Sequence, residues 1–359
     1  MSAQKTPLYY CHEALKAHMV TFANTWMPLR YDSEKEEHLA VRNAVGLFDV
    51  SHMGEFMLEG NVRDFLQKML TRDIYAMKSG KALYALMLNE RAGIIEDLIV
   101  YCLGENSFML CVNAANIERD WQWLSDHASA YKNLSLLNVS NEYAQLALQG
   151  KNALSLLSAL SSEAMPKRFW CKKMSLDNIN CLVARTGYTG EDGVEIFVDP
   201  HKAEQLWHML LEKGRAQNIK PCGLAARDSL RLEAGLLLHG TDINDQTTPL
   251  EAHLDFAVDK QNETFIGKLA HDAQILSGTK QSLVGFRLLE RGVARHGFTV
   301  LNQDHQPIGT VTSGSWPPTK DLAIGLAMLE APIPNPGTII YIDIRNRAVK
   351  AEVTAPRFL

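Results

Sequence analysis

Residues 98–112 read LIVYCLGENSFMLCV, in which two apolar runs flank the polar segment GENS. Apolar runs of this length on either side of a short turn containing Gly and Asn are typical of a β-hairpin. We therefore predict strands over 98–103 and 108–112, joined by a turn at 104–107. The hairpin indicates a β-sheet in the first half of the chain.

Two adjacent carboxylates, Glu96 and Asp97, lie where a glycine-containing turn enters the first of these strands. Asp97 is the leading candidate for the residue that does the chemistry, because Ile95 and Leu98 would partly desolvate it. A desolvated carboxylate responds readily to a proton on a substrate. Judged from these residues alone, a solvated turn pair without a catalytic role is the more common situation.

Two amphipathic helices are predicted beyond the hairpin. The first spans about 115–127 and carries Ile117, Trp121 and Leu124 on one face. The second follows Asp199, which is a suitable N-cap, and ends at Gly214. Short strands and amphipathic helices alternate over most of the first 270 residues, which favours a mixed α+β body.

The chain changes character after about residue 280, where short strand-like segments recur between turns rich in Gly, Pro, Asn and Asp. Regular short strands of this kind indicate a small sandwich or barrel. We expect one body over residues 1–275 and a separate β-domain over 280–359, with the polar stretch 270–281 as the linker. The predicted strands cover 283–288, 298–301, 307–311, 323–328, 338–344 and 349–353.

Composition narrows the class of partner. The chain has 359 residues, of which 46% are hydrophobic and 21% charged, and its net charge is −5. It has no long run of Lys and Arg, which argues against nucleic acid or an anionic membrane as the main partner, because phosphate binding needs clustered positive charge. The six cysteines lie mostly in apolar stretches and are expected to be buried thiols of a reducing cytoplasm. No signal peptide, transit peptide or membrane helix is predicted.

The densest local signal is RTGYTGEDGVEIF at 185–197, where three glycines allow sharp turns before a strand. The pleat of that strand sets Glu195 on the face opposite Val194 and Ile196. A carboxylate held on a rigid strand can accept two parallel hydrogen bonds from a planar N–H pair, either a guanidinium or the amino-pyrimidinone edge of a pterin. The alternative is an irregular hairpin with exposed acids, and the spacing is not that of a nucleotide-binding fingerprint.

A short helix closed by glycine is predicted over 223–235. It places Arg227 and Arg231 one turn apart, where like charges repel by a few tenths of a kcal/mol unless an anion or carboxylate lies against them. This repulsion suggests a partner, although a solvated face with acids nearby explains the pair equally well. His52 is a lone histidine, which is more often structural than catalytic. The sequence shows no P-loop, no recognisable Ser-His-Asp arrangement and no metal-ligand cluster, so no metal is expected.

Six segments form a pattern that spans essentially the whole chain. They are LFDVSHMGE at 47–55, EDL at 96–98, VNAA at 112–115, RTGYTGEDG at 185–193, AARDSLRLE at 225–233 and TPLEA at 248–252. In this order they strongly resemble the aminomethyltransferase, or T-protein, family of the glycine cleavage system. Agreement by chance at so many places is very rare.

The resemblance implies an α+β fold with three domains in a cloverleaf. Two interleaved mixed α/β domains would form a folate-binding body over residues 1–275, and a C-terminal β-barrel would follow over 280–359. The family transfers the one-carbon unit of the aminomethyl group on the dihydrolipoyl arm of H-protein to tetrahydrofolate, giving 5,10-methylenetetrahydrofolate and ammonia. Tetrahydrofolate would be the co-substrate and H-protein would supply the lipoyl group. Glycine decarboxylase and dihydrolipoyl dehydrogenase would act in the same cytoplasmic system.

The resemblance also implies roles for individual residues. Asp97 would be the catalytic carboxylate, Glu195 would bind the edge of the pterin, and Arg227 would be a second contact in the pterin pocket. Asp97 could accept a proton beside N5 of tetrahydrofolate or stabilise an iminium-like carbon electrostatically, and both roles remain open. The family's three domains surround a central channel, and the resemblance implies that Tyr84, Tyr101, Asn113 and Tyr188 line it.

The sequence departs from the family pattern at two places. Glu96 stands where the family usually has Asp, and the segment SWPPTK at 315–320 is unusual. The alternative function is that of a non-catalytic folate-binding protein of the same superfamily, which assists iron–sulfur cluster maturation. Those proteins carry a Lys-Gly-Cys-Tyr type of motif, and residues 259–268 contain no cysteine. Flavin-dependent demethylating dehydrogenases share the fold, but the chain shows no flavin domain with its glycine fingerprint.

Overall fold

The computed structural model describes residues 3–359. These residues divide into two compact units, each built from separate stretches of the chain. Of the described residues, unit 1 comprises 3–67, Asp73–Ala85 and Asp97–Arg227, and unit 2 comprises Lys68–Arg72, Leu86–Glu96 and Asp228–Leu359.

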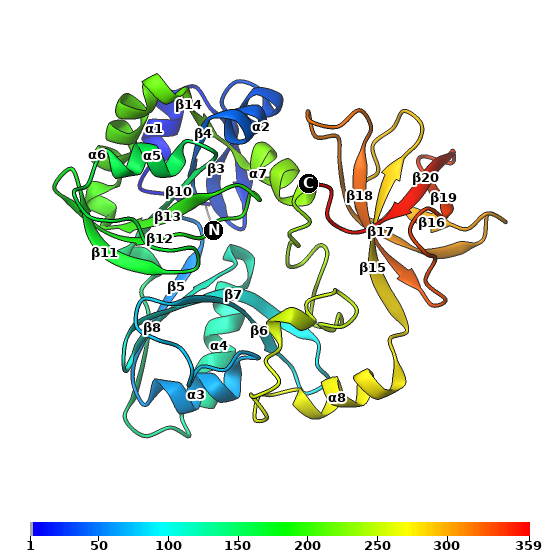
Figure 1. Cartoon of the computed structure of the whole chain (residues 1–359), viewed down its shortest axis with the longest axis horizontal. Coiled ribbons are helices and arrows are strands. Elements are labelled where there is room, and N and C mark those ends of the chain that lie inside the picture. Colours follow the sequence, from blue (N-terminus) through cyan, green and yellow to red (C-terminus); the bar gives the residue numbers. More distant parts are fainter. Residues whose placement is uncertain (1–2) are drawn as a thin grey trace. The chain divides into compact units, whose positions relative to one another are not determined.

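A six-stranded sheet in unit 1 has the strand order β11-β12-β13-β10-β4-β14 (Figure 1). Its strands pair antiparallel except at one edge, where β14 runs parallel to β4. The strands are β4 (Val45–Asp49), β10 (Ala144–Gln149), β11 (Cys171–Leu176), β12 (Ile179–Ala184), β13 (Gly193–Val198) and β14 (Ile219–Cys222).

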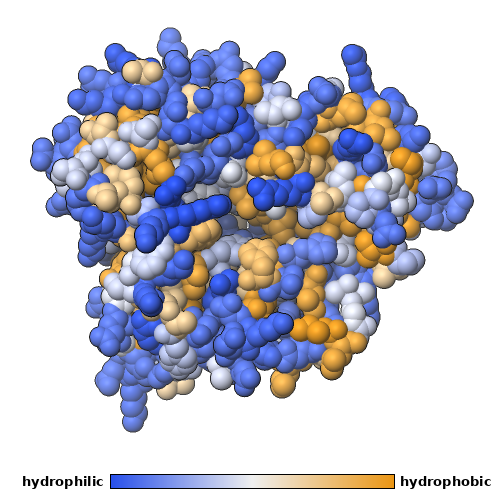
Figure 2. All heavy atoms as spheres, viewed as in Figure 1, coloured by the Kyte–Doolittle hydropathy of each residue, from blue (hydrophilic) through white to orange (hydrophobic). Residues whose placement is uncertain are grey.

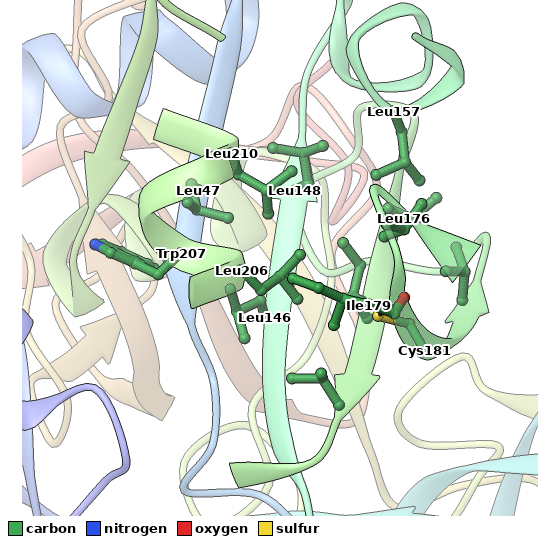
Figure 3. Close-up of a cluster of buried hydrophobic side chains, with 14 of the residues drawn as sticks. Leu47, Leu146, Leu148, Leu157, Leu176, Ile179, Cys181, Leu206, Trp207 and Leu210 are labelled. Carbon is green, nitrogen blue, oxygen red and sulfur yellow. Dashed lines mark hydrogen bonds between the residues drawn. The ribbon is translucent and has the colours of Figure 1, made fainter. Parts of the chain in front are cut away.

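Helix α6 (Pro200–Lys213) covers one face of this sheet. Figure 3 shows Leu206 and Leu210 of the helix directed at Leu146 and Leu148 of β10, and all four side chains are buried. The Asp199 side chain accepts a hydrogen bond from the backbone N–H of His201 at 2.8 Å, and the helix ends with Gly214 as its C-cap. The predicted N-cap and end of this helix are therefore confirmed.

A five-stranded sheet has the order β6-β7-β8-β5-β9. The predicted hairpin forms its centre, since β7 and β8 pair antiparallel with Gly104 opposite Ser107. Strand β7 begins earlier than expected, so Glu96 and Asp97 belong to the strand and lie on opposite faces. Glu96 is completely buried and is not part of a solvated turn. The strands are β5 (Gly54–Gly60), β6 (Ala82–Leu88), β7 (Ile94–Gly104), β8 (Ser107–Val112) and β9 (Leu134–Asn138).

The C-terminal strands close into a barrel with the order β15-β18-β17-β16-β19-β20. All six predicted strands are present, and their inward side chains, among them Phe286 and Val353, form a separate buried core. The fold class of mixed α and β elements followed by a C-terminal β-barrel is confirmed. The strands are β15 (Gln281–Leu288), β16 (Thr299–Leu301), β17 (Pro307–Ser315), β18 (Ile324–Glu330), β19 (Ile339–Asp343) and β20 (Ala348–Thr354).

The remaining elements in the described part of the chain are a small sheet and seven helices. The small sheet has the order β1-β3-β2. Most of the stretch that we expected as a linker is helical, because α8 spans Lys268–Ser277. The predicted helix near residue 115 is present as a 3₁₀ turn followed by α4. The bounds are β1 (Gln4–Lys5), β2 (His18–Phe22), β3 (Thr25–Arg30), α1 (Tyr9–Ala14), α2 (Glu34–Asn43), α3 (Val62–Met69), α4 (Ile117–Ala128), α5 (Ala153–Ser158) and α7 (Leu224–Glu233), with 3₁₀ turns at Ala114–Asn116, Ser140–Glu142, Gly214–Gln217 and Asp255–Ala257.

All six cysteines are buried, reduced thiols, as predicted. Hydrophilic residues cover much of the visible face of the molecule, with hydrophobic areas between them (Figure 2). Within residues 3–359, none of the helices has both the length and the apolar character needed to cross a membrane.

Candidate active site

Two donors from neighbouring segments hold the Asp97 carboxylate in unit 1. The Tyr84 hydroxyl on β6 donates to Oδ2 at 3.0 Å, and the Asn113 amide, which follows β8, donates to Oδ1 at 2.9 Å. The same Asn113 nitrogen also bonds the Asp97 carbonyl oxygen at 3.1 Å. These hydrogen bonds restrain the orientation of the Asp97 side chain, which is only partly buried. Three of the seven predicted site residues therefore form one hydrogen-bonded group.

The other four predicted residues, Glu195 on β13 with Tyr101, Arg227 and Tyr188, form a second group. Glu195 is only 9% exposed, and the Tyr101 hydroxyl donates to its Oε2 at 3.4 Å. Thr186 donates to the same oxygen at 2.5 Å. Among residues 3–359, nothing donates a hydrogen bond to Oε1 of Glu195, so this oxygen can accept hydrogen bonds from a bound molecule.

Arg227 supplies the positive charge of this group. Its guanidinium carbon lies 4.7 Å from the centre of the Tyr188 ring, which is a cation–π contact. Burial lowers the pKa of Arg227, while the electrostatic effects of Tyr188 and Glu195 act in the opposite direction. Burial, with Arg227 nearby, also lowers the pKa of His52 to about 4, so this histidine is neutral near pH 7.

The geometry of β7 connects the two groups. Asp97 and Tyr101 are four residues apart on the strand and therefore point to the same face, about 13 Å apart along it. The Asp97 group and the Glu195 group thus face the same side of the sheet, within unit 1.

The glycine-rich loop before β13 owes its shape to Gln149 on β10. The Gln149 amide nitrogen donates to the carbonyl oxygens of Thr186 and Val194 at 3.1 and 3.2 Å, and its oxygen accepts from the Thr189 hydroxyl at 2.9 Å. A Cβ at Gly187 would lie 2.0 Å from the Gln149 oxygen, which explains the glycine there. Gln149 therefore fixes the loop that carries Thr186 towards Glu195.

The structure adds Glu55 and Thr186 to the residues found by sequence reasoning. Glu55 on β5 is 1% exposed, and burial together with the nearby Glu195 charge raises the pKa of its carboxyl group well above the usual value. The Glu55 carboxyl group therefore loses its proton less readily than an ordinary glutamate, and it lies close to Glu195. Both residues lie in motifs noted above, but only the register of paired strands brings them to Glu195.

Comparison with known proteins identifies the family. A model described as the GCVT N-terminal domain matches residues 8–262, and a model of the glycine cleavage T-protein C-terminal barrel domain matches residues 281–359. The chain belongs to the glycine cleavage T-protein family. Together the two T-protein models match most of its length.

Individual relatives agree with this family over the whole chain. An aminomethyltransferase of Caldanaerobacter subterraneus subsp. tengcongensis is 44% identical over 359 residues, which cover 99% of this chain and 96% of the relative. An aminomethyltransferase of Bacteroides thetaiotaomicron is 41% identical, with 98% of this chain and 99% of the relative covered. The crystal structure of the glycine cleavage system aminomethyltransferase T from Bartonella henselae superposes with a TM-score of 0.93 at 35% identity, over 100% of this T-protein family chain and 98% of that one.

Proposed function

We propose that this chain is the tetrahydrofolate-dependent aminomethyltransferase of a glycine cleavage system. In this reaction the methylene carbon of the aminomethyl group on the dihydrolipoyl arm of H-protein forms bonds to N5 and N10 of tetrahydrofolate. Its bonds to sulfur and to the amine nitrogen break. The products are 5,10-methylenetetrahydrofolate, ammonia and the free dihydrolipoyl thiol. Membership of the T-protein family over the full length supports this reaction.

The environment of Glu195 gives the proposed function its main structural support. Glu195 is a buried carboxylate with an oxygen that accepts no hydrogen bond within residues 3–359, and Arg227 lies close enough to affect it electrostatically. A planar ligand edge with two adjacent N–H groups, such as that of a pterin, would satisfy this carboxylate. In the proposal Glu195 binds that edge, while Arg227 and Tyr188 contact the ring system and Tyr101 and Thr186 orient Glu195.

Asp97 is the proposed catalytic residue. It would accept the proton from N5 of tetrahydrofolate, or stabilise positive charge on the transferred carbon, and a positioned group of this kind contributes about 10²–10⁴ in rate. Tyr84 and Asn113 hold the carboxylate by hydrogen bonds and so keep it directed at the reacting atoms. This arrangement favours catalysis over folate binding without chemistry.

The proposed function also implies partner proteins and a cellular location. H-protein would deliver the lipoyl-bound substrate, and glycine decarboxylase and dihydrolipoyl dehydrogenase would complete the system. Six buried, reduced cysteines suit a reducing compartment, so we propose a cytoplasmic location. Residues 1–275 would form the folate-binding body and residues 280–359 the C-terminal domain.

A glycine-cleavage reconstitution tests the proposed function. The full chain is mixed with aminomethylated, lipoylated H-protein and tetrahydrofolate, and ammonia is measured. We expect ammonia release well above that of a mixture without the chain, and a dependence on tetrahydrofolate. Tight tetrahydrofolate binding without any ammonia above that control would instead support the iron–sulfur maturation alternative.

A further inference from the structure

Three side chains with metal-binding atoms meet at one edge of unit 1, apart from the residues described above. Cys11 lies on α1, and Glu204 and His208 lie on α6. The Cys11 sulfur is 3.8 Å from Nε2 of His208, and this nitrogen is 3.7 Å from Oε1 of Glu204. All three ligand atoms lie within 4.8 Å of one another.

Packing fixes the two helices that carry these atoms. Glu204 and His208 are one helical turn apart, so their side chains project from the same face of α6. Beside them, Trp207 is completely buried, and its ring makes an edge contact with the ring of His12 at 5.4 Å between centroids. Because His12 follows Cys11 directly, this contact sets α1 in register with α6. The three ligand atoms are therefore brought together before any ion binds.

The distances suit a tetrahedral ion. Metal–sulfur, metal–nitrogen and metal–oxygen bonds of the lengths found for zinc place the ligand atoms of a tetrahedral site about 3.4–3.6 Å apart. Two of the observed separations, 3.8 and 3.7 Å, need to shrink by only a few tenths of an ångström, and the Cys11 sulfur and the Glu204 oxygen lie within 4.8 Å of each other. The exposed side chains of Glu204 and His208 have the freedom to make this adjustment, since they are 72% and 57% exposed.

We propose that Cys11, Glu204 and His208 bind a divalent transition-metal ion of the zinc class. A thiolate, an imidazole and a carboxylate form a ligand set that zinc prefers, whereas magnesium and calcium prefer oxygen ligands only. Because two of the three ligands lie at the surface, water would occupy the fourth position. This site does not depend on the proposed aminomethyl transfer.

Binding would join α1 to α6 by metal bonds. An ion that binds the folded chain and not the unfolded one stabilises the fold. The stabilisation grows with the logarithm of the ion concentration once this concentration exceeds the dissociation constant. The site would therefore act as a metal-dependent clasp between an N-terminal helix and the helix that covers the six-stranded sheet. A measurable sign is a rise in melting temperature with zinc.

Cobalt titration of the purified full chain tests the site. Co²⁺ is the probe, because a cobalt–thiolate bond gives a charge-transfer band that cobalt bound only to nitrogen or oxygen lacks. We expect saturation at one Co²⁺ per chain, the thiolate band, and loss of that band when Zn²⁺ is added in equal amount. A parent chain that shows no saturable band would overturn the proposal.

Variants assign the ligands. Cys11→Ser should abolish the charge-transfer band, and His208→Ala, an exposed substitution that leaves the core intact, should weaken Co²⁺ binding at least about tenfold. Cys181→Ser removes another thiol of the same buried core, and Glu212→Gln removes an exposed acid of α6, so both should bind Co²⁺ like the parent. An undiminished band in Cys11→Ser, or unchanged affinity in His208→Ala, would reject the site. The rise in melting temperature with Zn²⁺ should disappear in the same two variants.

Discussion

Asp97 is held from two directions by neutral donors, so its charge can be removed while its shape is kept. Asp97→Asn should fold normally and bind tetrahydrofolate nearly as well as the parent, but turn over at least about tenfold more slowly, because a positioned proton acceptor contributes about 10²–10⁴ in rate. Ammonia release under saturating H-protein measures the effect. The matched control is Asp126→Asn on the exposed surface of α4, and unchanged turnover in Asp97→Asn would remove Asp97 from the mechanism.

Glu195 is expected to act in binding. Glu195→Ala removes a charged acceptor from the pterin edge, and a hydrogen bond to a charged group is worth about 1.5–3 kcal/mol, so tetrahydrofolate affinity should fall about tenfold to a hundredfold. Calorimetry with tetrahydrofolate provides the measurement, and Glu118→Ala at an exposed position of α4 serves as control. Equal affinity in Glu195→Ala and parent would reject the assignment.

Glu55 makes stability depend on pH. Burial and the nearby Glu195 raise its pKa in the folded chain. When the pH exceeds the usual pKa near 4.5, Glu55 therefore loses its proton in the unfolded chain before it does so in the folded chain. Stability contributed by neutral Glu55 is thus present at low pH and is lost as the pH rises towards the folded-state pKa. Glu55→Gln, which cannot ionise, should gain stability relative to the parent between pH 5 and pH 8. Urea unfolding at both pH values measures this gain.

A control on the same strand separates ionisation from other effects of the substitution. Glu59→Gln lies at the exposed end of β5, and its stability relative to the parent should not change between the two pH values. The same pH response in both variants would show that Glu55 is not the source.

At the scale of elements, α6 depends on its cap. Asp199→Ala removes the side-chain acceptor for the His201 N–H and should lower the free energy of unfolding by about 1 kcal/mol. Asp199→Asn retains an acceptor and should lose much less. Urea denaturation of the three chains distinguishes them, and equal stability of Asp199→Ala and parent would contradict a role for this cap.

Helices and turns that are marked by short-range sequence features could be predicted from the sequence, whereas the burial of individual side chains could not. The N-cap and closing glycine of α6 and the turn at 104–107 are short-range features, and both elements formed as expected. Glu96 and Asp97 were expected at a turn, where a pair of acids is commonly solvated, but β7 starts early enough to include both and to bury Glu96. The polar composition of 270–281 suggested a linker, yet most of it forms α8, because polar residues are compatible with an exposed helix.

At the scale of the whole molecule, a buried ion pair organises unit 2. Arg231 at the end of α7 donates to Asp242 at 2.5 Å, and Asp242 also accepts from the hydroxyls of Thr312 and Ser313 on β17 at 2.6 and 2.7 Å. This is the partner that the spacing of Arg227 and Arg231 suggested. The pair ties the chain after α7 to a strand of the barrel.

Removing one member of this pair should be severe. Asp242→Ala removes the buried counter-ion of Arg231 and leaves it only the half-exposed carboxylate of Asp228, and breaking a buried ion pair costs about 3–5 kcal/mol in other proteins. Thermal and urea unfolding of the full chain should show a large loss of stability, while Asp245→Ala, three residues on and exposed, should behave like the parent. A loss below about 1 kcal/mol would show that water or another group compensates Arg231.

Contacts between distant parts of the chain set the limit of sequence reasoning. Asp97, Glu195 and Arg227 could be named because they lie in family motifs, but their hydrogen-bonding groups depend on strand register. Cys11 and His208 are 197 positions apart, and no spacing rule connects them. Only the packing of α1 on α6 brings their atoms together.

The burial of the six cysteine thiols allows partial unfolding to be measured. In the folded chain the five cysteines on strands are buried, so an alkylating reagent reaches their sulfurs only through opening of the structure. The positions of the labelled cysteines then report which regions have opened, since five cysteines lie on strands and one lies on α1. Mass spectrometry of briefly alkylated samples would therefore measure partial unfolding of the native chain without an added label site.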